Sequence, residues 1–180
     1  MGDVVFYGAV SLDGYLAREN QALDWLFEAE KDAEDIGYEA FYATIDTVVM
    51  GRVTYDEVVR GGRAWPYAGK PSYVFSRTNR QGNQEVTFVQ EDPTAFVRDL
   101  KQRAPGRIWV VGGGLLLAPL IAEGLIDEYI VQVVPRIIGQ GIPLFHRIAT
   151  ETVLELTDVR RMGQFAELRY RTREVRGLPM

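Results

Sequence analysis

Residues 108–117 read Ile108-Trp109-Val110-Val111-Gly112-Gly113-Gly114-Leu115-Leu116-Leu117, an apolar β-type run joined by three glycines to an apolar helical run. At such a junction backbone amides can approach an anion, because a helix N-terminus has a positive dipole and N–H groups without partners. The segment therefore suggests a binding site for a phosphate or a dinucleotide. Glycines also serve simply to turn a strand into a helix. Leu117 moreover stands where the Gly-x-Gly-x-x-Gly fingerprint has glycine or alanine, so the site must be argued from other segments.

The chain on both sides of this junction alternates between strand and helix patterns. Short apolar runs predict strands at residues 4–10, 47–50, 72–75, 86–89, 108–111 and 128–134. Apolar residues at steps of three and four predict one helix from Asp24 to near Thr44. Further helices are expected directly after Gly51, after the capping pair Asp92-Pro93, and over 115–123.

The C-terminal tail changes to strict alternation, in which Ala166, Leu168 and Tyr170 are separated by charged residues. This pattern predicts an antiparallel hairpin that turns at 162–164. The fold expected is a single α/β domain over residues 1–180, a three-layer αβα arrangement whose mixed, mostly parallel central sheet ends in the hairpin. A ligand crevice is expected at the carboxyl ends of the parallel strands.

Composition narrows the classes of function. The chain has 180 residues and a formal net charge of -5, so a broad basic surface for nucleic acid is not expected. It has no cysteine, which excludes disulfides and thiolate metal sites, and a single histidine, His146, to which no task is assigned. No apolar run reaches the roughly 18 residues of a membrane span, so we expect a cytoplasmic protein without a metal site.

Three predicted strand ends carry residues suited to phosphate. They are Gly51-Arg52-Val53-Thr54, Ser76-Arg77-Thr78 and the triple glycine. The forked donors of two arginines and two helix N-termini suit a ligand with separate phosphates. Alternatively, Thr54 caps a turn, Arg52 pairs with Asp56 at helical spacing, and Arg77 is solvated surface.

With these three strand ends and the motifs around them, the chain resembles the dihydrofolate reductase-like superfamily. The closest likeness is to the reductase domain of bifunctional riboflavin-biosynthesis deaminase-reductases and its stand-alone relatives. The likeness runs from about Val4 to Phe145 and rests on the order of the motifs. These are Ser11-x-Asp13-Gly14-Tyr15-Leu16-Ala17, Asp24-Trp25, Met50-Gly51-Arg52-x-Thr54, Ser76-Arg77, Gly112-Gly113-Gly114, Asp127-Glu128 and Pro135-x-x-x-Gly139-x-Gly141-x-Pro143-Leu144-Phe145.

The resemblance implies an NADPH-dependent oxidoreductase that acts on a pterin-like or ribosylamino-pyrimidine-like heterocycle. It would be similar to 5-amino-6-(5-phosphoribosylamino)uracil reductase or to dihydrofolate reductase. The cofactor phosphates would lie at Gly51, Arg52 and Thr54, with Ser76 and Arg77 around the 2′-phosphate. Relatives often have a cis bond where this chain has Gly112-Gly113. The cofactor would also contact Gly112, Gly113, Gly114 and Leu115, and its nicotinamide side would be lined by Ala9, Leu16 and Ala17.

The residues that would bind the substrate are less clearly indicated than those that would bind the cofactor. Trp25 is interpreted as a core residue or as pocket wall on the substrate side. The resemblance implies that Gly139 and Gly141 lie in a substrate-facing loop, although these glycines can equally form a plain loop. Folate reductases use one carboxylate just after the tryptophan, and the position is ambiguous among Glu28, Glu30 and Asp32. Asp13 is interpreted as a turn former that hydrogen-bonds its own backbone and supports the site.

The sequence also leads to an alternative function and to an expected oligomeric state. The alternative function is a non-catalytic nucleotide- or flavin-binding module of the same fold, because no clear proton donor is present. A homodimer is expected to form through the apolar run 129–134 beside Ile137-Ile138.

Overall fold

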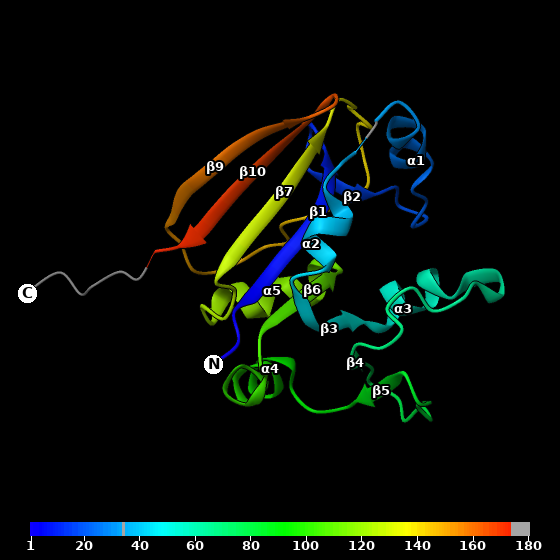
Figure 1. Ribbon diagram of the computed structural model, residues 1–180, viewed down its shortest axis with the longest axis vertical. Helices are drawn as coiled ribbons and strands as arrows, with labels where there is room; N and C mark the ends of the chain where they lie inside the picture. The colour runs from blue at the N-terminus through cyan, green and yellow to red at the C-terminus, as the bar shows by residue number, and fades with distance from the viewer. Residues whose placement is uncertain (34, 174–180) are drawn as a thin grey trace, which may run out of the picture.

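A computed structural model describes residues 1–33 and 35–173. Its strands form one eight-stranded sheet in the order β5-β4-β3-β6-β1-β7-β10-β9 and a small two-stranded sheet, β2-β8 (Figure 1). The strands are β1 (Val4–Ser11), β2 (Tyr15–Ala17), β3 (Ile45–Gly51), β4 (Ser72–Phe75), β5 (Val86–Val89), β6 (Arg107–Gly112), β7 (Glu128–Val134), β8 (Ile142–Pro143), β9 (Leu154–Met162) and β10 (Phe165–Thr172). The helices are α1 (Asp24–Glu30), α2 (Tyr38–Tyr42), α3 (Arg52–Val58), α4 (Pro93–Arg103), α5 (Gly114–Ala122) and the 3-10 turn η1 (Arg60–Gly62).

The predicted fold class is confirmed. Neighbouring strands from β5 to β7 pair in parallel, whereas β10 is antiparallel to both β7 and β9. Phe96 of α4 and Leu117 of α5 pack in the core on one face of the sheet. Phe41 of α2 packs on the other face, against Val48 and Trp109. Helices therefore cover both faces, and the carboxyl ends of six parallel strands meet at one edge.

The single helix predicted from Asp24 to near Thr44 is wrong. The segment forms two short helices, α1 and α2, and α2 begins after Gly37, whose φ of 75° is left-handed. α1 has already ended at Glu30, and the left-handed Gly37 marks the start of a separate helix, while the apolar period continues across the break. Ile36 still packs against the core beside Trp25, which explains why the pattern resembled one helix.

The surface predicted for a homodimer is also wrong in part. β7 is an interior strand between β1 and β10, and Tyr129, Ile130 and Val134 are at most 2% exposed. An apolar run buried on both faces belongs to the core rather than to an interface. Of the predicted patch, Ile137 is exposed, at 72%.

Among the described residues, every helix is too short or too polar to traverse a lipid bilayer.

Candidate functional site

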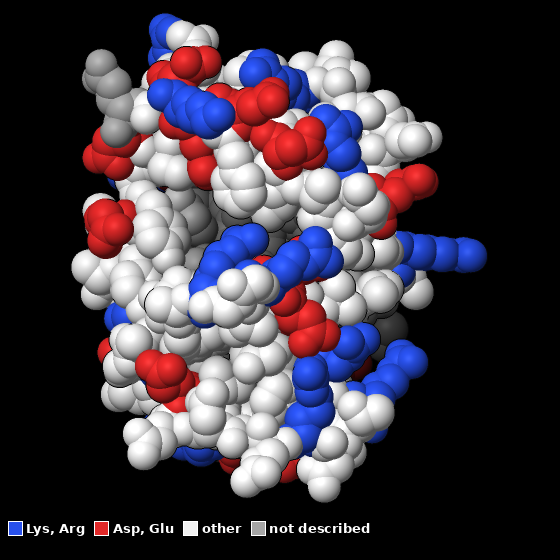
Figure 2. Space-filling model, turned by 90° about the vertical axis from the view of Figure 1, so that its right-hand side faces the viewer, with Lys and Arg blue, Asp and Glu red and all other residues white. Residues whose placement is uncertain are grey.

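Two adjoining hollows lie at the sheet edge where the parallel strands end. The first, the apolar hollow, has a volume of about 590 Å³, and the second, the basic hollow, about 870 Å³. Gln21, Thr54, Gly113 and Ile142 line both, so the two form one trough. Figure 2 shows this side of the molecule, hollowed near its middle, with Lys and Arg side chains beside the opening. The volumes lie in the range of small-molecule sites, about 300–1,000 Å³.

The basic hollow brings together the three strand ends that the sequence singled out. Its lining includes eight of the residues predicted to hold a cofactor, namely Gly51, Arg52, Thr54, Ser76, Arg77, Gly113, Gly114 and Leu115. Gly112 is buried directly behind them, and the Gly112–Gly113 peptide bond is cis. Parallel pairing of β3 with both β4 and β6 explains this convergence, because it places their carboxyl ends side by side.

An arginine that the sequence did not indicate, Arg80, also lines the basic hollow. Its guanidinium contacts the Asp56 carboxylate at 2.9 Å and lies 5.2 Å from the centre of the Phe88 ring. Arg52 contacts the other oxygen of the same carboxylate at 2.7 Å, so the alternative ion pair with Asp56 does form. Asp56 thus holds two arginines at one wall of the hollow, with donors left for an anion because each guanidinium has five N–H groups.

Glycines at the strand ends keep the bottom of the basic hollow open. Gly51 has ordinary extended angles, φ −79° and ψ 159°, and a Cβ there would lie 3.8 Å from the Gly112 carbonyl oxygen. A Cβ on Gly113 would lie 3.7 Å from Thr54 Oγ1. Side chains at these positions would therefore enter the space where a ligand can approach the backbone.

His146 is not a plain surface residue. It lines the basic hollow, and its Nε2 is buried without a hydrogen-bond partner among the described residues. The ring packs against Gly114, where an added Cβ would come within 2.5 Å of His146 Cδ2. Gly114 is thus required for close contact between the start of α5 and the loop after β8.

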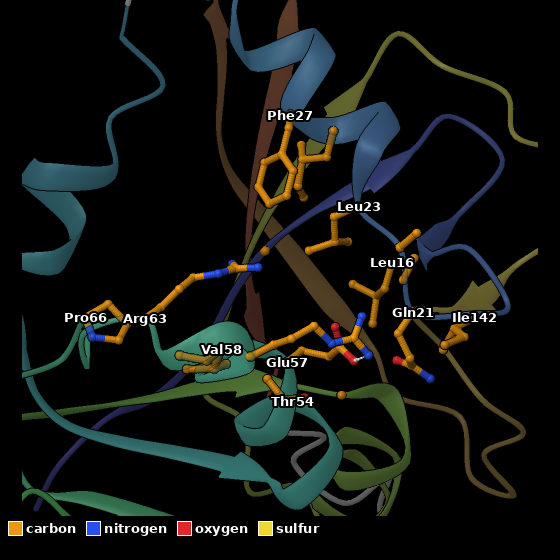
Figure 3. Close-up of a pocket in the computed structure, with 18 of the residues that line it drawn as sticks. Leu16, Gln21, Leu23, Phe27, Thr54, Glu57, Val58, Arg63, Pro66 and Ile142 are labelled. Carbon is orange, nitrogen blue, oxygen red and sulfur yellow. Dashed lines mark ion pairs between the residues drawn. The ribbon is translucent and has the colours of Figure 1, made fainter.

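The apolar hollow contains Ala9, Leu16 and Ala17, the residues predicted for the nicotinamide side. Figure 3 shows Phe27 of α1 and Leu23, the residue just before α1, on one side of this hollow and Val58 and Thr54 of α3 on the opposite side. Leu23, Phe27 and Val58 have no distinct motif in the sequence. They belong to the lining only because the chain places α1 opposite α3.

The residues predicted for substrate binding lie apart from both hollows. Trp25 is 2% exposed and packs in the core with Val134 and Phe165, so of its two interpretations the structure supports core rather than pocket wall. Gly139 and Gly141 lie in the loop between β7 and β8 and are absent from the lining of either hollow. A Cβ on Gly141 would lie 2.3 Å from the Ala17 carbonyl oxygen, so this glycine permits the close pairing of β2 with β8.

The three carboxylates considered as proton donors, Glu28, Glu30 and Asp32, do not line the apolar hollow. Glu28 and Asp32 are exposed, and burial raises the pKa of the half-buried Glu30. The carboxylate that lines the apolar hollow is instead Glu57 of α3, which pairs with Arg60 at 2.7 Å. No sequence pattern indicated Glu57, because it is a single acidic residue on a short helix.

Asp13 connects two loops in addition to supporting its own turn, where its carboxylate contacts Ser11 and its own backbone amide. Its carboxylate accepts hydrogen bonds from the backbone N–H of Gly139 at 2.8 Å and of Ile138 at 3.2 Å. A hydrogen bond from Ser11, together with these amides, lowers the pKa of Asp13. The predicted supporting role therefore acts across the chain, between the loop after β1 and the loop after β7.

We expect Asp13→Asn to lower the melting temperature at neutral pH, because the charged acceptor of two amides is lost. A carboxyl group whose pKa is lowered by folding stabilises the native state above its ordinary pKa, and this contribution disappears as the pH falls through the lowered value. The difference between wild type and variant should therefore shrink on acidification. Thermal melts across an acidic pH series measure this, and a difference that grows in acid would contradict the assignment.

Comparison with known proteins gives consistent matches over nearly the whole chain. The family model described as "RibD C-terminal domain" matches residues 3–166. The Bacillus subtilis (strain 168) protein named "Uncharacterized protein YwjB" is 42% identical over 167 residues, covering 92% of this chain and 95% of the relative. The crystal structure of a "Putative riboflavin biosynthesis protein" from Shewanella sp. PV-4 has a TM-score of 0.84 at 29% identity, covering 97% of this chain and 100% of the other.

A more distant structure shows the same fold. Dihydrofolate reductase from Enterococcus faecalis, complexed with NADP(H), has a TM-score of 0.62 at 18% identity. The match covers 96% of this chain and 98% of the reductase.

Proposed function

Because this chain belongs to the RibD C-terminal domain family, we propose that it is an NADPH-dependent reductase of a small pyrimidine-like or pterin-like heterocycle. Membership confirms the resemblance drawn from the ordered motifs. The observation that carries the proposal is the continuous trough, in which a hollow rich in arginine opens into a hollow with apolar walls. This division suits a cofactor with phosphates at one end and a flat, uncharged ring at the other.

The residues of the basic hollow fit the phosphates of NADPH. Arg52, Arg77 and Arg80 supply positive charge on one wall. The nine-residue helix α5 supplies free amides and its positive dipole end at Gly114. Because Gly51 and Gly113 have no side chain, the phosphates can approach the backbone. The 2′-phosphate, which NADH lacks, would contact Ser76 and the arginines near it.

The apolar hollow fits the reacting rings. Ala9, Leu16 and Ala17 would contact the nicotinamide, and Leu23, Phe27 and Val58 would enclose the substrate ring next to it. NADPH supplies a hydride when bound, and the protein holds the two rings together and excludes water. Thr54 and Gly113 lie where the two hollows meet, so they would mark the passage from the phosphates to the ring.

We expect Arg80→Gln to weaken NADPH binding about tenfold while NADH binding changes little, because a charge-assisted hydrogen bond to the 2′-phosphate is lost. Titration calorimetry with both nucleotides measures this. Arg98→Gln is the matched control, since Arg98 also pairs with a carboxylate, Glu123 at 2.9 Å, but lies outside both hollows. An equal loss for both nucleotides would contradict a role in recognising the 2′-phosphate.

The reductase proposal is tested by two measurements on the same purified protein. Saturable NADPH binding is expected, followed by loss of NADPH absorbance when dihydrofolate or 5-amino-6-(5-phosphoribosylamino)uracil is added. Absence of NADPH binding would refute the proposal. Binding without turnover of any such substrate would favour the non-catalytic nucleotide-binding alternative.

A further inference from the structure

We propose that Gln21 binds the cofactor directly, through hydrogen bonds from its carboxamide to the ribose that joins the phosphates of NADPH to the nicotinamide ring. The inference rests on the proposed function and adds a residue to its site. Gln21 lies in the loop between β2 and α1, which none of the sequence motifs included. Together with Thr54, Gly113 and Ile142 it lines both hollows.

The backbone of Gln21 has an unusual conformation. Its φ is 69°, in the left-handed region, and within residues 1–33 and 35–173 it is the only residue other than glycine with a positive φ. Glycine adopts this region at little cost, and asparagine is the next most common choice, whereas a longer side chain is unfavourable there. A glutamine at this position therefore costs stability. Such a conformation at a binding site indicates that the side chain serves function rather than folding.

Hydrogen bonds from the surrounding loop hold Gln21 in this conformation. The backbone N–H of Arg18 donates to the Ala22 carbonyl oxygen at 3.0 Å, and the N–H of Gln21 donates to the Arg18 carbonyl oxygen at 2.9 Å. The Arg18 guanidinium also binds both carboxylate oxygens of Asp24, the first residue of α1, at 2.7 and 2.9 Å. The position of Gln21 is thus fixed by its backbone and its neighbours, which leaves its own side chain available.

The carboxamide of Gln21 has no partner in the described part of the chain. None of the hydrogen bonds within residues 1–33 and 35–173 involves it. Figure 3 shows the side chain beside Ile142 and Leu16, with the carboxamide directed away from α1. A carboxamide offers an acceptor oxygen and two N–H donors. It therefore suits sugar hydroxyl groups, each of which both donates and accepts.

The place of Gln21 along the trough indicates which part of the cofactor it would meet. In the proposed arrangement the basic hollow holds the phosphates and the apolar hollow holds the nicotinamide. The ribose between these groups must then lie where the two hollows join, which is where Gln21, Thr54 and Gly113 are found. Phosphate oxygens are better matched by the charged arginines of the basic hollow than by a neutral amide. The ribose hydroxyls are thus the groups that fit Gln21.

The test uses three nucleotides that share a 2′-phosphate. They are NADPH, 2′-phospho-ADP-ribose, which lacks only the nicotinamide, and 2′-phospho-ADP, which also lacks the ribose. Gln21→Gly removes the side chain and keeps the left-handed backbone. By titration calorimetry of the full chain, we expect it to bind the first two about tenfold more weakly than wild type and the third within about twofold. Its melting temperature without nucleotide should stay within about 2 °C of wild type, because glycine tolerates this φ.

Two further variants separate the amide from other causes. Gln21→Asn keeps a residue that suits the left-handed backbone but has a shorter side chain, so its losses should lie within about threefold of those of Gln21→Gly. Gln164→Gly is the matched control, since Gln164 is an exposed glutamine in the turn between β9 and β10, outside both hollows. It should leave all three affinities unchanged.

The inference is overturned if Gln21→Gly binds all three nucleotides as wild type does. It is also overturned if that variant loses affinity for all three equally, which would indicate a contact with phosphate, or for NADPH alone, which would indicate a contact with the nicotinamide. Wild-type affinity in Gln21→Asn would assign the effect of glycine to loop flexibility and overturn the inference as well. In each of these cases wild type still binds NADPH, so the proposed function stands. A wild type that binds none of the three nucleotides would refute both.

Discussion

Gly51→Val should fold normally and lose NADPH affinity by about 100-fold or more. Gly51 already has the extended angles that valine prefers, and its added Cβ would find its nearest neighbours at 3.8 and 4.0 Å, which is ordinary contact. The new side chain would stand between the ends of β3 and β6, where phosphate must approach the backbone. Losing two charge-assisted hydrogen bonds of about 1.5 kcal/mol or more each corresponds to this change in affinity.

Gly51→Ala provides the graded control, because one methyl group blocks less of the same space. We expect a smaller loss of NADPH affinity for alanine than for valine, measured by calorimetry. Melting temperatures without NADPH should lie close to that of wild type for both variants. Unchanged NADPH affinity in a folded Gly51→Val protein would show that the basic hollow does not hold the cofactor phosphates.

The parts of the fold that local chemistry determines could be predicted from the sequence. Asp92 accepts hydrogen bonds from the amides of Thr94 and Ala95, and Pro93 begins α4, as the capping pair indicated. The hairpin of β9 and β10 follows from strict alternation. The meeting of the three strand ends could also be predicted, because strands paired in parallel have their carboxyl ends at one edge of the sheet. The lining of the basic hollow confirms this prediction.

Other parts of the site depend on contacts between distant segments, which no local pattern shows. Arg80 is 24 positions from its partner Asp56, and before folding it resembles any surface arginine. Asp13 binds amides more than 120 positions away, and the sequence indicated only its contacts within its own turn. Glu28, Glu30 and Asp32 were candidates through the resemblance alone, and none of the three lines either hollow.

On β10 the alternation of apolar and charged residues predicted the strand but not the burial of one of its charged side chains. Alternation normally places charged residues in water, but Glu167 is 1% exposed. Its carboxylate accepts hydrogen bonds from Arg169 Nε at 2.8 Å and from Gln132 Nε2 at 2.9 Å. Gln132 also donates to the Ile36 carbonyl oxygen at 2.6 Å. This buried network therefore fixes the segment between α1 and α2 on the sheet.

Glu167→Leu should destabilise the protein by about 3–5 kcal/mol, because it leaves the partly buried Arg169 without its anion and Gln132 without one acceptor. For a chain of this length that corresponds to a fall in melting temperature of about 10 °C. Glu155→Leu is the matched control on the neighbouring strand β9, where the glutamate is exposed and the change should stay within about 0.5 kcal/mol. The double variant Glu167→Leu with Arg169→Leu should recover most of the loss, since a buried ion pair can be replaced by apolar side chains at little cost. Urea unfolding of the four proteins measures these differences, and a single variant as stable as wild type would show that the network contributes nothing to folding.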